Sequence, residues 1–135
     1  MSRIESNIAE INNSPEKVFN FLSDMNNFGK LMPEQVINWK STVDNCSFTI
    51  KGMTDLSMKI SEKTPNTKVV YIPDGKVPFN FSLNINLQNP KENLCIAQII
   101  FDAELNAMME MLASKPLQNF VNMLAAKLKE LGDKL

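Results

Sequence analysis

The feature that most constrains the fold is a strict alternation of apolar and polar side chains between residues 79 and 88. Every second position is apolar, and asparagine, serine or glutamine occupies the positions between. A period of two places successive side chains on opposite faces of an extended chain. The segment therefore predicts a strand with one buried face and one wet face. The apolar set is Phe79, Phe81, Leu83, Ile85 and Leu87.

The same period of two extends from about residue 36 to residue 105. Turn-forming pairs or triplets divide it, which predicts six consecutive antiparallel strands joined by hairpins. These turn signals lie at residues 44–45, 65–66, 73–75 and 89–90. One further strand is expected over residues 3–11, with Ile4 and Ile8 sharing a face.

Helical signals stand on either side of the period-two region. Residues 14–16, Ser-Pro-Glu, supply a hydroxyl N-cap, a proline at the first helical position and an acidic side chain in the first turn. An apolar stripe then continues to Met25, and a second short helix is expected over residues 28–32. Two short helices should therefore lie between the first and second strands.

A long amphipathic helix is expected at the C-terminal end. Gly132 is a suitable stop, and Pro116 would be costly inside a helix, so we expect a break near Ser114 with a short helical segment over residues 107–113 before the long helix. The apolar stripe that predicts the long helix consists of Leu117, Phe120, Val121, Leu124, Leu128 and Leu131.

This order of elements predicts one α+β domain over residues 1–135. A curved, seven-stranded antiparallel sheet should wrap around the long C-terminal helix. Because a helix with its side chains is only ~10 Å wide, the sheet must curl to bury its apolar face. A cavity can remain wherever sheet and helix do not touch.

Composition excludes several function classes. The chain has no histidine, so catalytic triads and histidine metal sites are not expected. Arg3 is the only arginine and the net charge is −1, which argues against nucleic acid as a partner. Cys46 and Cys95 are expected to be reduced core thiols, and we expect no metal and no cofactor.

Neither a membrane segment nor a secretory leader is expected. No apolar run approaches the ~20 residues that a membrane span needs. Residues 1–10 lack the basic region and apolar stretch of a secretory signal. We therefore expect a cytoplasmic protein without an integral membrane segment.

The chain resembles the START-like, or Bet v 1-like, helix-grip superfamily (SRPBCC), which includes polyketide cyclases and lipid-transfer domains. The resemblance covers almost the whole chain and rests on the element order and on four local stretches. It is similar to the compact bacterial branch, because residues 43–47 lack the glycine-rich loop of the plant relatives. The four stretches are residues 14–19 (SPEKVF), Met32-Pro33 with Trp39, residues 48–53 (FTIKGM) and the helix over residues 116–128.

The resemblance implies an elongated cavity between sheet and helix that holds an apolar or amphipathic molecule, such as a lipid or polyketide. A packed core would use the same apolar residues, so the residues alone leave both readings open. The candidates for contact with a ligand are Trp39, Phe48, Met58, Tyr71, Phe79, Phe81, Leu83, Ile99, Phe101, Met108, Met109, Leu112, Phe120 and Leu124.

Some candidates carry a more specific hypothesis. The methionine cluster at residues 108–111 could line an adaptable entrance, cap the core or meet a second copy of the chain. Tyr71 and Trp39 could hydrogen-bond the polar end of a ligand. Lys51 and Lys59 are expected on the wet face of the sheet.

Binding without catalysis is the first functional hypothesis, with no catalytic residue assigned. The alternative is a cyclase or dehydratase in which Tyr71, Asp102 or Glu104 moves protons. Asp102 and Glu104 share a strand face but oppose the Phe101 series, so both are expected to be solvated. A third hypothesis is an interaction module or homodimer that uses the methionine-rich patch.

Overall fold

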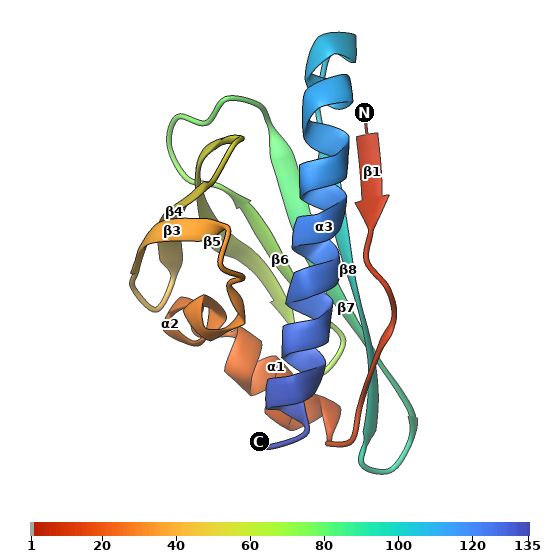
Figure 1. Ribbon diagram of the computed structural model, residues 1–135. Coiled ribbons are helices and arrows are strands. Elements are labelled where there is room, and N and C mark those ends of the chain that lie inside the picture. The colour runs from red at the N-terminus through yellow and green to blue at the C-terminus, as the bar shows by residue number, and fades with distance from the viewer. Residues whose placement is uncertain (1) are drawn as a thin grey trace.

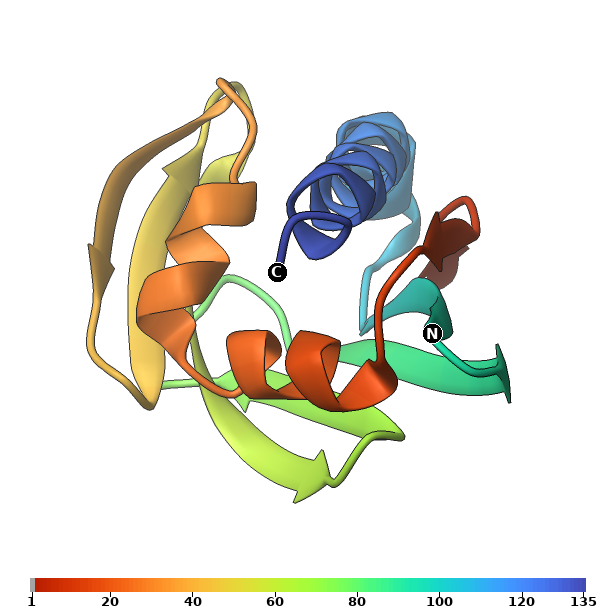
Figure 2. The same cartoon turned by 90° about the horizontal axis from the view of Figure 1, so that it is seen from below.

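An open, curved antiparallel sheet wraps around one long helix, and two short helices close one end of the curve (Figure 2). The computed structural model describes residues 2–135. The strands are β1 (Ser2–Glu5), β2 (Ala9–Ile11), β3 (Val36–Ser41), β4 (Asn45–Ile50), β5 (Thr54–Thr64), β6 (Lys68–Pro73), β7 (Phe81–Lys91) and β8 (Leu94–Ala103). The helices are α1 (Pro15–Leu22), α2 (Met25–Phe28), the 3-10 turn η1 (Gly29–Leu31) and α3 (Ala107–Gly132).

The strand order is β1-β8-β7-β6-β5-β4-β3, and β2 also pairs with β8. From β3 to β8, each strand pairs antiparallel with the next, so the predicted chain of hairpins is confirmed. Residues Phe81 to Leu87 alternate between buried and half-buried, as does all of β8. The buried positions form the concave face that meets α3, and each large apolar side chain there contributes about 1.5–3 kcal/mol.

The expected first strand is divided into two, which gives eight strands in place of seven. The break lies at Ser6, whose backbone N–H donates to the Ile99 carbonyl (2.8 Å). The Ser6 hydroxyl in turn accepts a hydrogen bond from the Ile99 N–H (2.9 Å) and stands in for a backbone carbonyl of the ladder. This irregularity shifts the alternation, so the expectation that Ile8 shares the buried face of Ile4 was wrong: Ile8 is 56% exposed.

The first helix begins as predicted, because the Ser14 hydroxyl accepts a hydrogen bond from the Lys17 N–H (3.3 Å). The second short helix starts earlier than expected, at Met25. Asp24 provides the reason: its carboxylate accepts from the Asn26 N–H (2.9 Å) and caps α2.

The turn between β7 and β8 also differs from its prediction. It lies after Lys91, where Asn93 adopts a left-handed backbone with a φ of 57°, and not at Asn89-Pro90. Pro90 is accommodated within β7 because the pairing register shifts between Gln88 and Lys91.

The C-terminal helix is one continuous element of 26 residues (Figure 1), so the expected break near Ser114 was wrong. Pro116 cannot donate to the Leu112 carbonyl, which costs about 3 kcal/mol in a helix interior. The helix stays intact because Ala113 and Leu117, on either side of the proline, are both buried against the core.

The C-terminal end of α3 is hydrogen-bonded to Asn12 and Asn13, near the start of the chain. The amide of Asn13 donates to the carbonyls of Gly132 (3.0 Å) and Leu135 (2.8 Å), and the Asn12 N–H donates to Asp133 (2.8 Å). Gly132 ends the helix as predicted, and it also allows a close approach: a Cβ there would lie 2.6 Å from Ile11.

Both cysteines are buried and free, as predicted. Burial raises the pKa of the Cys46 thiol to about 12 and that of the Cys95 thiol to about 11. The two thiols are therefore protonated packing groups of the sheet core.

Replacement of Pro116 by alanine should stabilise the protein. Alanine restores an N–H donor and is about 3 kcal/mol more favourable than proline within a helix, while the greater freedom of the unfolded chain costs about 1 kcal/mol. We expect Pro116→Ala to raise the free energy of unfolding by about 2 kcal/mol in urea denaturation. Ser114→Ala, in the same turn, serves as the control and should change it by no more than about 0.5 kcal/mol. An unchanged or lower stability of Pro116→Ala would contradict this account of the helix.

Candidate ligand-binding site

A row of aromatic rings fills the space between α3 and the β3–β4 side of the sheet. Ring centroids lie 6.1 Å apart from Phe120 to Phe48, 5.6 Å from Phe48 to Trp39, 6.3 Å from Trp39 to Phe28 and 5.0 Å from Phe28 to Tyr71. Three of these contacts are stacked and the last is edge-on. The row joins α3 to β4, β3, α2 and β6. An apolar ligand that entered between α3 and the sheet would contact these aromatic rings.

The two polar groups on this row are engaged within the protein. The fully buried Tyr71 hydroxyl donates to the Leu22 carbonyl (2.9 Å), and burial raises the pKa of the phenol well above its usual value. The Trp39 indole N–H donates to the Ser41 hydroxyl (3.2 Å). Neither group is free for the polar end of a ligand in this arrangement.

Trp39 joins the row because of a local irregularity in β3. The register shifts between Ile37 and Lys40, and Asn38 has a φ of 57°. Gly29 leaves room for the ring, since a Cβ there would lie 2.5 Å from the indole nitrogen. The bulge and the glycine together allow an edge strand to contribute a half-buried tryptophan to the core.

A hollow of about 240 Å³ opens at the edge where the β4–β5 turn faces α3. The apolar part of its lining comes from Ile50, Pro116 and Phe120, so the end of the aromatic row is reached from here. We call it the helix-edge hollow, and its lining consists of Gln35, Ile50, Lys51, Lys115, Pro116, Asn119 and Phe120.

Backbone hydrogen bonds shape the sheet side of the helix-edge hollow. The Lys51 N–H donates to the Gln35 carbonyl (2.8 Å), and the Met53 N–H donates to the Ile50 carbonyl (3.0 Å). Gly52 takes a left-handed conformation with a φ of 76°, which closes this tight turn. Lys51 is exposed to water as predicted, but it belongs to this turn and not to a strand, whereas Lys59 is exposed on β5 as predicted.

The fourteen candidate residues from the sequence fall into three groups. Trp39 and Met109 are half-buried, whereas Met108 and Leu112 are exposed on the first turns of α3, at 71% and 72%. Of all fourteen, Phe120 lines the helix-edge hollow. The third group consists of the buried candidates, which are Phe48, Met58, Tyr71, Phe79, Phe81, Leu83, Ile99, Phe101, Phe120 and Leu124.

Met108 and Leu112 are joined on the surface by Met111, which is 85% exposed. We call these three residues the methionine end. Leu112, Lys115, Pro116 and Asn119 recur at intervals of three and four, so they share one face of α3. This face leads from the methionine end into the helix-edge hollow.

The two carboxylates considered for proton transfer lie outside the helix-edge hollow. Arg3 donates to Asp102 (2.9 Å), and Glu104 is exposed. Both line a separate hollow of about 130 Å³ on the outer face of the sheet, beside Asn80 and Ser82. Asp102 is half-buried in its ion pair with Arg3, and Glu104 is exposed to water.

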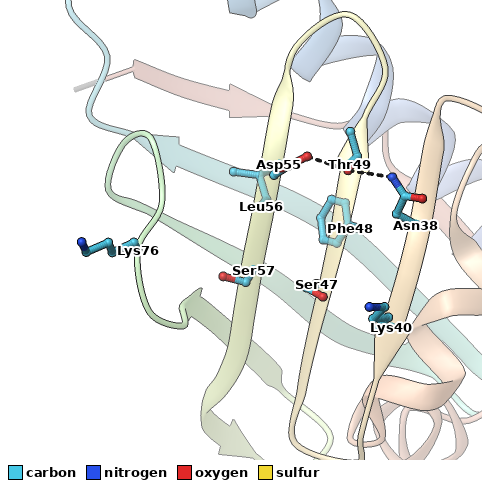
Figure 3. A pocket seen from close by; sticks show the side chains of 9 residues that line it. All are labelled: Asn38, Lys40, Ser47, Phe48, Thr49, Asp55, Leu56, Ser57 and Lys76. Carbon is cyan, nitrogen blue, oxygen red and sulfur yellow. Dashed lines mark hydrogen bonds between the residues drawn. The ribbon is translucent and has the colours of Figure 1, made fainter.

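A larger hollow, of about 320 Å³, lies on the outer face of β3, β4 and β5 (Figure 3). Its polar groups bond to one another: Asn38 donates to the Thr49 hydroxyl (3.4 Å), which donates to Asp55 (2.6 Å). Lys40 and Lys76 also line it, together with two serines. Phe48 and Leu56 also belong to this outer-face hollow, but polar groups make up most of its exposed lining, so it suits an apolar ligand less well than the helix-edge hollow.

Among residues 2–135, no group of three or more cysteine, aspartate or glutamate side chains is arranged to hold a metal ion. Within the same range, α3 and the shorter helices lack a stretch apolar enough to cross a membrane.

No protein-family model matches the sequence, and no curated protein does. Solved structures match over nearly the whole length. The KanY protein, solved by NMR, aligns with a TM-score of 0.75 at 10% identity, covering 98% of this chain and 99% of its own. A START superfamily protein from Mycobacterium smegmatis aligns with a TM-score of 0.68 at 12% identity, covering 96% and 98%. The Aha1 dimer from Colwellia psychrerythraea gives 0.61 at 20% identity, covering 100% and 96%.

These likenesses define the fold: the chain has the helix-grip architecture of START-like proteins, as the sequence predicted. In this chain, an aromatic row lies under α3 and an open edge lies beside Pro116.

Removal of the Tyr71 hydroxyl should destabilise the protein. Tyr71→Phe leaves the buried Leu22 carbonyl without its donor, which costs about 1–3 kcal/mol. Thermal or urea unfolding measures the loss, and Phe79→Leu, a change in a buried aromatic residue that makes no such hydrogen bond, provides a comparison for altered packing. An unchanged stability of Tyr71→Phe would show that the hydroxyl does not hold α1 to the sheet.

Proposed function

We propose that this protein binds a small apolar or amphipathic molecule, of the lipid or polyketide class, between the curved sheet and α3. The ligand enters at the helix-edge hollow. The observation that carries the proposal is the continuity between this hollow and the aromatic row, since Phe120 belongs to both. Burial of ligand surface there provides roughly 25 cal/mol per Å² of apolar area.

The position of Pro116 supports the same site. A proline within a helix breaks a local rule at a cost in stability, and such departures are expected at functional sites. Pro116 lies in the wall of the helix-edge hollow. Its ring adds apolar surface, and without an N–H it leaves the Leu112 carbonyl without the usual helical donor.

The size of the hollow sets a limit on the ligand. Its volume of about 240 Å³ is smaller than the ~300–1,000 Å³ of typical small-molecule pockets. A short alkyl chain fits against Ile50 and Phe120, whereas a larger ligand has to displace aromatic side chains of the row. Binding of such a ligand therefore requires movement of Phe120 and Phe48.

The cyclase or dehydratase alternative has less support in the geometry. Tyr71 is fully buried and bonded to Leu22, and Asp102 is paired with Arg3 on the outer face. Proton transfer to a ligand in the helix-edge hollow would need a titratable donor beside it. Lys51 and Lys115 are the titratable groups in its lining.

Occlusion of the helix-edge hollow tests the proposal. Asn119 is exposed in its lining, so an indole placed there by Asn119→Trp should fill the hollow without disturbing the core. We expect 1-decanol and decanoate to shift the amide signals of Ile50 and Phe120 in NMR titrations. The affinity for both probes should fall by about tenfold in Asn119→Trp, equivalent to about 1.4 kcal/mol.

The matched control is Ala126→Trp, at an exposed position of α3 outside the hollow. It should bind both probes as the unchanged protein does. Absence of binding by either probe, or equal losses in the two tryptophan variants, would reject the helix-edge hollow as the binding site.

A second candidate function is self-association through the methionine end. Met108, Met111 and Leu112 are 71%, 85% and 72% exposed, and contiguous exposed apolar side chains are typical of interaction surfaces. The structural neighbour from Colwellia psychrerythraea is described as a dimer.

Sedimentation velocity tests this second candidate. A dimer held by the methionine end should dissociate in the triple variant Met108→Ser, Met111→Ser and Leu112→Ser, whose side chains are exposed and do not support the core. A monomer at all concentrations of the unchanged protein would exclude self-association by this surface.

A further inference from the structure

The charges around the helix-edge hollow are all of one sign. Lys51 reaches it from the β4–β5 turn, and Lys115 reaches it from α3. The other polar residues of the lining are the amides of Gln35 and Asn119, and no carboxylate belongs to it. Two cations from different elements therefore line the same partly apolar hollow, in a chain whose net charge is −1.

These two lysines are not part of the ion pairs that the described chain forms. The pairs found among residues 2–135 join Arg3 to Asp102, Lys68 to Glu62, Lys127 to Glu130 and Lys129 to Asp133. Both lysine residues are exposed to water. Long lysine side chains lay their methylene groups along apolar surface and keep the charge at the edge, which places both charges around the mouth of the hollow.

The outer-face hollow differs from the helix-edge hollow in the charges and polarity of its lining. It also has two lysines, Lys40 and Lys76, but its lining includes the carboxylate of Asp55, and hydroxyl and amide groups outnumber its two apolar side chains, Phe48 and Leu56. The helix-edge hollow combines unopposed positive charge with the apolar side chains of Ile50, Pro116 and Phe120. This combination matches a molecule that has an apolar tail and an anionic head.

We infer that the ligand of the helix-edge hollow is an amphipathic carboxylate whose head group lies between Lys51 and Lys115. This inference rests on the proposed binding function and narrows its ligand class. The alkyl part contacts Ile50, Pro116 and Phe120, and the carboxylate remains at the edge, where it keeps part of its hydration. Because exposed ion pairs are individually weak, the two lysines select for charge and add only modestly to affinity.

A matched pair of probes with the same alkyl chain tests the inference. Decanoate and 1-decanol differ in the head group alone, and decyltrimethylammonium reverses the charge. In low salt, decanoate should bind about tenfold more tightly than 1-decanol, and decyltrimethylammonium should bind most weakly. The preference for decanoate should diminish as salt is added, because the charges lie near the surface.

Lysine-to-methionine variants test whether Lys51 and Lys115 cause the preference for decanoate over 1-decanol. Lys51→Met and Lys115→Met keep an unbranched side chain and remove the charge, and each should weaken decanoate about threefold while the double variant loses about tenfold. The ratio of the decanoate affinity to the 1-decanol affinity should fall by the same factors, since this ratio separates the loss of charge from any change in the apolar lining. Lys63→Met, at an exposed position of β5 outside the hollow, is the control and should affect neither probe. Thermal unfolding of every variant checks that the fold is retained.

The outcomes separate the inference from the function on which it rests. If 1-decanol binds at Ile50 and Phe120 as tightly as decanoate, the charge preference is wrong and the binding function stands. The inference also fails if the double lysine variant retains the full preference for decanoate. If none of the three probes binds, the proposed function fails and the inference fails with it.

Discussion

The helix is narrower than the sheet that it has to cover, and the rest of the structure depends on this mismatch. A helix with its side chains is about 10–12 Å across, and α3 packs mainly over β1, β2 and β8. The β3–β4 half of the concave face therefore needs another covering. Rings from Phe120 to Tyr71 supply it, in steps of 5.0–6.3 Å between centroids. The aromatic row is thus the filling of a gap that the fold itself creates.

The regular part of the fold could be predicted because each strand carries its own pattern. The alternation along β7 and β8 identified the buried face, and the Ser14 cap located α1. Two of the failures occurred where a distant partner determines local structure. Ile8 is exposed because Ser6 bonds to Ile99, more than ninety positions away. Pro116 stays inside a helix because its neighbours are buried against the sheet.

The candidate site was less predictable than the fold, for a related reason. Sequence patterns identified apolar residues such as Phe120 and Leu124, and the structure buries both. The helix-edge hollow arises where residues 50–51 face residues 115–120. No local sequence pattern predicts that these two segments lie opposite each other. Nothing in the sequence around Lys51 and Lys115 distinguishes them from ordinary surface lysines. The one available signal was Pro116, a residue that fits its helix poorly.

The fastening of α3 at one end has a mechanical consequence. Asn12 and Asn13 bind its final residues, and Gly132 lies against Ile11, so the C-terminal end of α3 is held in place by several contacts. At the opposite end, the hydrogen bond from Ser2 to Glu110 is exposed to water, and the methionine end makes few contacts. Gln118 and Asn122 bond to Glu5 and Asn7, so a displacement confined to the turns before Ala113 breaks the fewest contacts and leaves the packing around Asn13 unchanged.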